Sequence, residues 1–206
     1  MSVSRFRPRG DSGAYAVLYA GLVVVMIAMA AIVVDLSSVR QDRRLNRSAA
    51  DAAALGGAGF LLPTGTINPN LACVTAWQYL NATLQLNLSS GSITSNCSSF
   101  PTVYGSCPSD EIDQDVVVGT RTIRIAWPVP STGGSGFLNA DIAPGNIGQP
   151  FDGSSKAGDG STAGCDRLGV AISQHQGFGL AGAFGPSGTD TQVHSVALAV
   201  VSSGPG

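Results

Sequence analysis

The sequence predicts an α+β protein in which a long N-terminal helix precedes a second helix and a small antiparallel sheet. Three observations lead to this prediction. Residues 14–34 contain no charged side chain, and residues 69–84 repeat apolar side chains at helical spacing. Within residues 116–127 and 167–201, short apolar runs alternate as they do in strands. With 206 residues, the chain has room for one domain and an anchor.

Charge is divided unevenly along the chain. Residues 1–60 hold seven Arg and four acidic residues, whereas residues 61–206 hold four basic and nine acidic residues. A nucleic-acid-binding domain would carry a basic stripe on its folded surface, and this domain is mildly acidic. We therefore expect no nucleic-acid partner.

Residues 14–34 have the length and composition of a membrane-spanning helix. At about 1.5 Å per residue, a helix of this length covers roughly 30 Å, the hydrocarbon thickness of a bilayer. A helix buried in a soluble core is rarely apolar on every face. Ala28-Met29-Ala30 also has the form of a signal-peptidase site, which leaves a removed signal peptide as the alternative. Apolar residues continue to Val34, so we favour a stable anchor.

The helix is predicted to continue beyond the apolar segment to about residue 56. Residues 35–55 contain no Pro and are mostly helix formers, and Gly56 and Gly57 supply a stop signal. Near its end the helix carries a narrow stripe of small residues, namely Ala49, Ala50, Ala53 and Ala54. Such a stripe allows another helix to approach closely, either from a partner protein or from the chain's own domain.

Several motifs follow one another in this N-terminal segment. They are Gly13-Ala14-Tyr15-Ala16-Val17, Val34-Asp35-Leu36, Arg43-Arg44-Leu45 and Ala49-Ala50-Asp51-Ala52-Ala53-Ala54-Leu55. Their order over about residues 9–58 resembles the N-terminal segment of TadE/TadG-like Flp pilus-assembly proteins. The resemblance implies a pilin-like fold, a pseudopilin-like role in assembly, and partners among the lipid bilayer and other pilus-assembly or envelope proteins. It also implies a cytoplasmic N-terminus and an extracytoplasmic body.

The segment departs from the family pattern in two places, and both bear on which branch of the family it resembles. Pilins and TadE-type members carry a Glu five residues after the processing Gly, and Leu18 stands at that place. Cleavage after Gly13 is therefore not expected, and the segment is more similar to the TadG-like branch, which stays anchored. Larger members of that branch add a von Willebrand A domain with a D-x-S-x-S metal site. Here Lys156 breaks the nearest such sequence, which starts at Asp152.

The chain is predicted to divide into three parts. Residues 1–13 form a basic cytoplasmic tail, and residues 14–57 form the transmembrane helix with its Arg- and Ala-rich continuation. Residues 58–206 form an extracytoplasmic α+β domain. Within it, a Gly- and Ser-rich insertion at about 131–164 has few large apolar residues and is predicted to be flexible.

All four cysteines follow the apolar segment, and none lies in a metal-binding spacing: Cys73, Cys97, Cys107 and Cys165. Dispersed cysteines of even number in an exported domain predict two disulfides, with three possible pairings. The short loop between Cys97 and Cys107 favours that pair, and hence a second pair of Cys73 with Cys165. Buried free thiols are the alternative for a cytosolic domain.

Periodicity predicts the elements of the body. Residues 69–84 form a helix with one apolar face, consisting of Leu71, Val74, Trp77, Leu80 and Leu84. Residues 87–110 read as loop, and a hairpin turns at Gly119. A strand follows at residues 167–173, then a short turn or helix at 175–184. The last strand, at residues 192–201, has its apolar positions at Val193, Val196, Leu198 and Val200.

The sequence offers no motif for catalysis. His175 and His194 lie outside any zinc-binding pattern, and no G-x-S-x-G motif occurs. The acidic cluster at residues 110–115 lacks the Gly and closing Glu of a calcium loop, so we interpret it as a solvated face. We expect no enzyme activity, no cofactor, no metal and no small-molecule substrate.

The leading hypothesis is a membrane-anchored component of Flp pilus assembly that acts through helix–helix and domain–domain interactions. The alternative is a secreted or anchored extracytoplasmic binding protein or adhesin unrelated to pili. An anchored enzyme is the third and least supported possibility.

Overall fold

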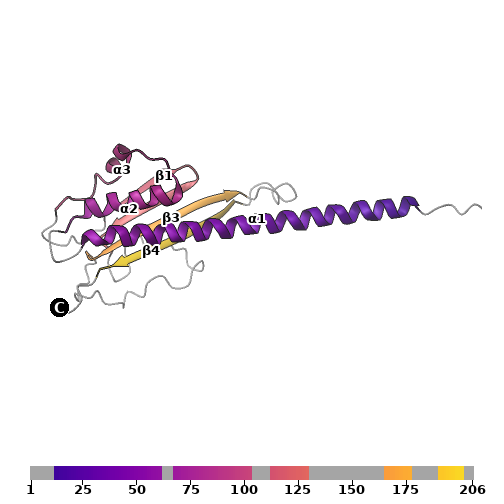
Figure 1. The fold of residues 1–206 in the computed structure, drawn as a ribbon, viewed down its shortest axis with the longest axis horizontal. Helices are drawn as coiled ribbons and strands as arrows, with labels where there is room; N and C mark the ends of the chain where they lie inside the picture. The colour runs from indigo at the N-terminus through magenta and orange to yellow at the C-terminus, as the bar shows by residue number, and fades with distance from the viewer. Residues whose placement is uncertain (1–11, 62–66, 104–111, 130–164, 178–189, 202–206) are drawn as a thin grey trace, which may run out of the picture. The chain divides into compact units, whose positions relative to one another are not determined.

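The computed structural model describes residues 12–61, 67–103, 112–129, 165–177 and 190–201. Its elements are, in order, α1 (Ser12–Ala58), the short 3₁₀ helix η1 (Gly59–Leu61), α2 (Pro69–Leu84), α3 (Ser90–Asn96), β1 (Ile112–Val118), β2 (Arg121–Trp127), β3 (Arg167–Gly177) and β4 (Asp190–Val200) (Figure 1). The predicted fold class is confirmed: a long N-terminal helix and a further helix accompany a small antiparallel sheet of four strands. The predicted insertion at 131–164 lies outside the described residues.

The chain forms two compact units whose boundary falls inside α1, between Ser38 and Val39. Among the described residues, the first unit contains α1 up to Ser38 together with Gly177. The second contains the rest of α1, the other helices and the sheet. α1 itself is one continuous helix across this boundary.

The sheet has the strand order β1-β2-β3-β4, and it starts with the predicted hairpin. Gly119 makes the turn with a φ of 62°, a left-handed conformation that Gly adopts without steric cost. Ile123 pairs with Val116 on one side and with Ile172 on the other. Because side chains alternate along a strand, this register gathers the large apolar residues of β2 and β3 on one face.

The main core lies between this face of the sheet and the helices of the second unit. It combines strand residues such as Ile125, Trp127 and Val170 with Trp77 and Leu80 of α2 and with the C-terminal part of α1. A smaller cluster lies on the opposite face of the sheet and consists of Ala126, Val129 and Ala171, with Val196 and Leu198 packed against it.

Helix α2 begins and ends as its sequence predicts. Asn68 is the N-cap, where its side chain accepts a hydrogen bond from the Leu71 amide, and Pro69 occupies the first turn. The helix ends at Gln85, which has a φ of 53° and donates its amide to the Asn81 carbonyl. Of the predicted apolar face, Leu71 is the exception because it is 39% exposed; Ala72, Cys73 and Ala76 share the buried face instead.

Three local predictions are wrong. The predicted loop contains helix α3, whose N-cap Ser89 accepts a hydrogen bond from Ser92. Strand β3 continues through Gly177, so His175 lies in a strand and not in a turn. In β4 the buried positions are Val193, Ser195, Ala197 and Ala199, so the predicted apolar set is right at Val193 and out of register after it; Val196 and Leu198 pack against the smaller cluster. Small residues suit these positions because α1 lies close to β4: the Ser195 hydroxyl reaches a backbone carbonyl of the helix, as described below.

Candidate membrane anchor and assembly segment

The N-terminal part of α1 leaves its apolar side chains uncovered. In residues 15–38 nearly every side chain is exposed, and only Ala31 and Asp35 are buried. The exposed large apolar residues are Tyr15, Val17, Leu18, Tyr19, Leu22, Val23, Val24, Val25, Met26, Ile27, Met29, Ile32, Val33, Val34 and Leu36. Among the described residues, α1 is the one helix long and apolar enough to cross a membrane, judged by length and composition.

The free energy of this exposed surface constrains its surroundings. Full burial of a Val, Leu, Ile or Met side chain stabilises a protein by about 1.5–3 kcal/mol, so the thirteen such side chains exposed here represent tens of kcal/mol in water. Apolar patches of this extent mark a contact with membrane or protein. The segment therefore fits an apolar environment, whether lipid or other helices.

The predicted small-residue stripe occupies a different environment. Ala49, Ala50, Ala53 and Ala54 are all buried in the main core of the second unit. One turn further along, Gly57 is so close to α2 that a Cβ atom built on it would lie 2.6 Å from the Ala72 carbonyl oxygen. Of the two alternatives from the sequence, the stripe packs within the chain's own domain.

The same face of α1 carries a buried polar residue one turn before the Ala stripe. Asn46 is fully buried, and its amide nitrogen donates to Gln174 Oε1 of β3 at 2.8 Å. Its Oδ1 accepts a hydrogen bond from Arg121 Nε of β2 at 3.3 Å. Both polar ends of the amide are thus used, which makes burial of this side chain tolerable.

Two further hydrogen bonds extend this contact along the helix. Gln176 of β3 donates from Nε2 to Asp42 Oδ2 at 2.5 Å, and Ser195 Oγ of β4 donates to the Arg43 carbonyl at 3.5 Å. Together with the bonds of Asn46, they connect α1 to β2, β3 and β4. We name Asp42, Asn46, Arg121, Gln174 and Gln176 the polar clamp. Sequence reasoning missed the clamp, although Asp42 and Asn46 lie one turn apart on the face that continues into the Ala stripe.

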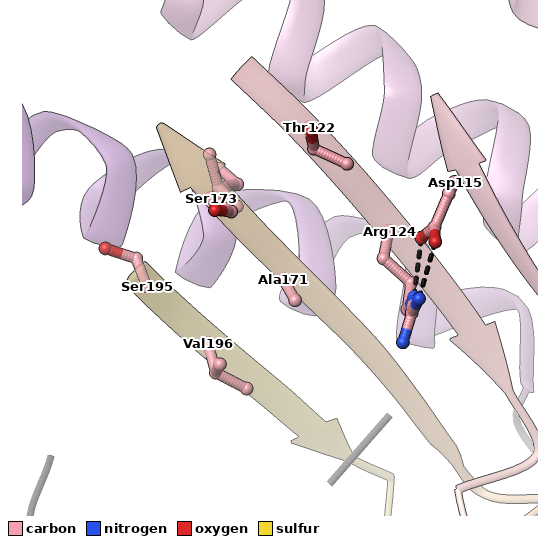
Figure 2. Close-up of a pocket in the computed structure, with 8 residues that line it drawn as sticks. Asp115, Thr122, Arg124, Ala171, Ser173, Ser195 and Val196 are labelled. Atoms are coloured by element: carbon pink, nitrogen blue, oxygen red, sulfur yellow. Dashed lines mark hydrogen bonds and ion pairs between the residues drawn. The ribbon is translucent and has the colours of Figure 1, made fainter. Parts of the chain in front are cut away.

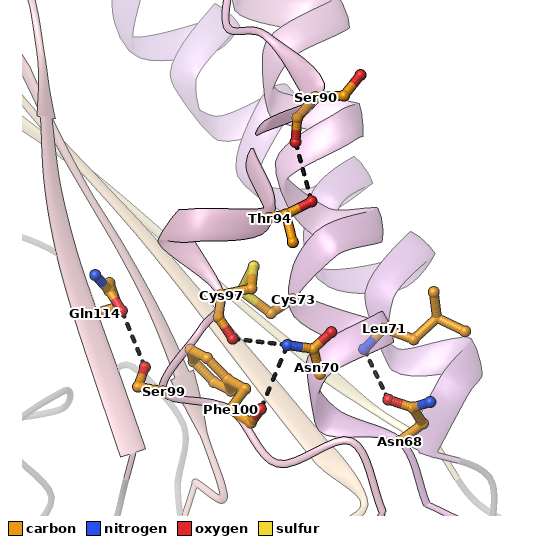
Figure 3. Close-up of a disulfide and its surroundings, with 10 residues drawn as sticks. All are labelled: Asn68, Asn70, Leu71, Cys73, Ser90, Thr94, Cys97, Ser99, Phe100 and Gln114. Atoms are coloured by element: carbon orange, nitrogen blue, oxygen red, sulfur yellow. Dashed lines mark hydrogen bonds between the residues drawn. A yellow bond between two sulfur atoms is a disulfide. The ribbon is translucent and has the colours of Figure 1, made fainter. Parts of the chain in front are cut away.

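The cysteine pairing differs from the one favoured by loop length. Cys73 of α2 is bonded to Cys97, with their Cα atoms 5.8 Å apart (Figure 3). The favoured pairs, Cys97 with Cys107 and Cys73 with Cys165, are therefore wrong. Cys165 is disulfide-bonded as well, and Cys107 lies outside the described residues.

Local structure explains why Cys97 meets α2. Helix α3 ends at Cys97, and Asn70 in the first turn of α2 donates its side-chain amide to the carbonyls of Cys97 and Phe100, at 2.8 and 3.4 Å (Figure 3). Phe100 is buried in the main core. The unpredicted helix α3 and these bonds bring Cys97 beside Cys73, which loop length alone does not reveal.

The outer face of the sheet carries the acidic residues of the predicted cluster. Asp115 of β1 forms a two-point contact with Arg124 of β2 (Figure 2). A carboxylate oxygen of Asp113 lies 3.7 Å from Nε of the same arginine. Asp115 and Arg124 line a small pocket on this face, together with Thr122, Ser173 and Val196 (Figure 2). Both carboxylates are thus engaged with a cation, while residues 110 and 111 lie outside the described part.

The two histidines do not form a catalytic or metal site in the part of the chain that the structure describes. His175 is exposed on β3, and its backbone amide donates to the Thr120 carbonyl at 3.1 Å. His194 lies on β4. No group of three His, Cys, Asp or Glu side chains suited to a metal ion occurs among the described residues.

The fold and the exposed helix define a class of protein: a small α+β domain preceded by a helix apolar enough to enter a membrane. The family comparison makes this class specific. Residues 13–59 match the Tad family of Flp pilus-assembly TadE/G-like proteins, which confirms the resemblance of the N-terminal segment. The match coincides with α1 and the first residue of η1. No curated protein and no solved structure matches the chain.

Proposed function

We propose that this chain is a membrane-anchored, pseudopilin-like component of Flp pilus assembly that works through helix–helix and domain–domain interactions. The observation that carries the proposal is the match of α1 to the TadE/G-like segment, which supports a role in pilus assembly. Within the matched segment, residues 15–36 expose an apolar surface, and the part from Asn46 onward is packed into a domain. Such a segment is suited to joining a folded domain to an apolar phase.

The burial of the Ala stripe changes which residues we assign to partner helices. Ala49, Ala50, Ala53 and Ala54 have no surface left for a partner, because they are in the domain core. Contacts with other membrane helices are instead assigned to residues 15–36. Gly21 belongs to this stretch, and a Cβ atom built on it would meet nothing within 4 Å, so its backbone is open to close approach.

The proposed topology places the N-terminus in the cytoplasm and the body outside it. A disulfide between Cys73 and Cys97, with Cys165 also bonded, supports an oxidising compartment for the domain. Tyr15 and Tyr19 lie one turn apart at the start of the apolar stretch, where amphipathic rings favour the membrane interface. We propose a non-enzymatic role, because the sequence contains no motif for catalysis.

The test introduces charge into the apolar stretch. Replacing Val24 and Val25 with Asp places two carboxylates near its centre, each costing about 2.5–3.5 kcal/mol on insertion scales. We expect the double variant to be extracted from membranes by carbonate and to lose Flp pili in a host that lacks the natural protein. The matched control, Val24→Leu with Val25→Leu, keeps the stretch apolar and should retain both properties.

Two outcomes would overturn this function. Normal pili with the Asp variant would show that assembly does not depend on the apolar stretch. An intact mass from the membrane fraction that lacks about the first 30 residues would identify a removed signal peptide. The second result would favour the secreted binding protein instead.

A further inference from the structure

Helix α1 carries four arginines on one face directly after its apolar stretch. They are Arg40, Arg43, Arg44 and Arg47, and we name them the arginine stripe. Their spacing of three, four and seven residues places them on the same side of a helix. All four side chains are exposed. The buried face of α1, which includes Asn46 and Ala50, borders the stripe, but the four arginine side chains themselves extend into solvent, so the core does not use these charges.

The stripe is not neutralised within the described part of the chain. The ion pairs there involve Arg124 and Arg167, and none involves the stripe. Three carboxylates of α1 lie near the stripe: Asp35 is buried, Asp42 accepts a hydrogen bond from Gln176 on the core side, and Asp51 is exposed one turn beyond Arg47. Four exposed guanidinium groups, with Asp51 as the one exposed carboxylate among these three, leave a strongly positive helix face.

The position of the stripe along α1 indicates what it meets. The last large exposed apolar residue before it is Leu36. At about 1.5 Å per residue, Arg40 follows roughly 6 Å further along the helix and Arg44 roughly 12 Å. The headgroup region beyond the hydrocarbon is about 5–8 Å deep on each side, and a long Arg side chain can extend several ångströms along the helix. The first three guanidiniums are therefore within reach of lipid phosphates.

Resting on the proposed membrane anchoring, we propose that the arginine stripe binds the phosphate groups of anionic phospholipids at the membrane surface that the domain faces. The planar guanidinium presents paired N–H donors that match phosphate oxygens. The apolar stretch inserts the helix into the membrane, and the stripe determines that the lipids next to it are anionic. An acidic protein surface is the competing occupant, and the test separates the two.

The experiment uses the full disulfide-bonded chain reconstituted in phosphatidylcholine vesicles that also contain phosphatidylglycerol. Spin-labelled phosphatidylglycerol and phosphatidylcholine report which lipid is immobilised at the protein. We expect the wild type to prefer the anionic probe about fivefold or more, the effect of roughly one cationic side chain at a membrane surface. The preference should fall as salt rises.

Three variants assign the preference to the stripe. Changing all four arginines to Gln should reduce the ratio to near one, while changing all four to Lys should keep most of it because the charge remains. The matched control is Gln41→Ala with Ser48→Ala, two exposed neighbours outside the stripe, and it should behave as the wild type. Carbonate extraction of each variant reports the anchor separately: a Gln variant that stays in the membrane shows that anchoring holds whatever the lipid preference.

Several results would overturn the proposal. If the wild type does not prefer the anionic probe, or if the Gln variant keeps that preference, the stripe does not bind anionic lipid. Displacement of the probe by inorganic phosphate, beyond that caused by chloride at equal ionic strength, would assign the stripe to a free anion. A photo-crosslinker at position 41 provides the last test. If it captures a protein in cells, and the Gln variant loses this capture but keeps the wild-type lipid preference, the stripe binds a protein partner.

Discussion

At the scale of single residues, the polar clamp is the feature that distinguishes this core from a purely apolar one. Asn46 satisfies both ends of its amide with partners from two different strands, Arg121 and Gln174. Buried polar groups of this kind contribute little net stability, but they penalise any packing that leaves them unpaired. The clamp therefore favours one register of α1 on the sheet.

Replacing Asn46 with Ala should lower the free energy of unfolding by about 1–3 kcal/mol, because Gln174 and Arg121 would lose a partner. Trp77 and Trp127 are both fully buried, so their fluorescence can follow urea unfolding of the full chain in detergent. The control is Gln41→Ala, an exposed residue of the same helix, which should leave the midpoint unchanged. Equal midpoints for Asn46→Ala and the control would mean that the clamp does not contribute.

At the scale of elements, α1 and α2 are held together by small residues where they meet. The ring of Tyr79 occupies the space that a side chain on Gly56 would need. At Gly57 the obstacle is the α2 backbone itself, which cannot move aside as a flexible side chain can. The Ala stripe continues this close contact toward the sheet.

Gly57→Ala should therefore destabilise the domain despite the better helix propensity of Ala. Its methyl group would lie too close to the Ala72 carbonyl and to Leu168, and overpacking of this kind costs about 1–3 kcal/mol. Gly59→Ala is the matched control, because a Cβ atom built there meets nothing within 4 Å. Urea unfolding should separate the two variants; a Gly57→Ala midpoint at or above that of Gly59→Ala would contradict the packing described here.

The disulfide between α2 and α3 acts on the same scale. It closes a loop with a sequence separation of 24. In the chain-entropy model, a crosslink over a loop of that size stabilises the folded state by about 3–4 kcal/mol. Cys73→Ser with Cys97→Ser should lower the free energy of unfolding by an amount of this order, measured without reductant. Loss of the α2–α3 contact would also appear as faster amide exchange in residues 90–96, and unchanged exchange and stability would rule out a stabilising role.

At the scale of the whole molecule, one helix supplies two kinds of surface. Its first part exposes apolar residues from Tyr15 to Leu36, and its second part contributes small and polar residues to a domain core. The family match covers both parts, so the matched segment includes residues with different physical roles. Substitutions in the first part are expected to affect membrane association and assembly, and those in the second to affect folding.

This separation makes a prediction for the intact chain. Val24→Asp with Val25→Asp should leave the free energy of unfolding of the detergent-purified protein within about 0.5 kcal/mol of the wild-type value, because exposed positions away from the core rarely contribute more. Ala53→Leu should instead reduce stability strongly, since this Cβ is fully buried. Tryptophan fluorescence in urea compares the two; a large loss of stability in the Asp variant would show that the two parts of α1 are energetically coupled.

Much of the architecture was accessible from the sequence because its signals are local. The apolar stretch, the helix that ends near Gly57, the α2 helix with its Pro69 start and the hairpin at Gly119 all follow from periodicity and backbone preference. The family resemblance also rests on contiguous residues. Helix α3 was not predicted because seven residues rich in Ser and Gly carry little helical signal. The alternation of β4 was predicted out of register after Val193 because its other buried positions, Ser195, Ala197 and Ala199, are small.

The sequence by itself determined that this chain has an apolar helix of membrane-spanning length followed by an α+β domain, since helix length and alternation need no information about distant residues. Only the tertiary structure decided what that helix contacts. Three features depend on residues far apart in the chain: the packing of the Ala stripe in its own domain, the buried face of β4 and the pairing of Cys97 with Cys73. Asn46 and Gln174 are separated by 128 positions, and no local pattern encodes their hydrogen bond.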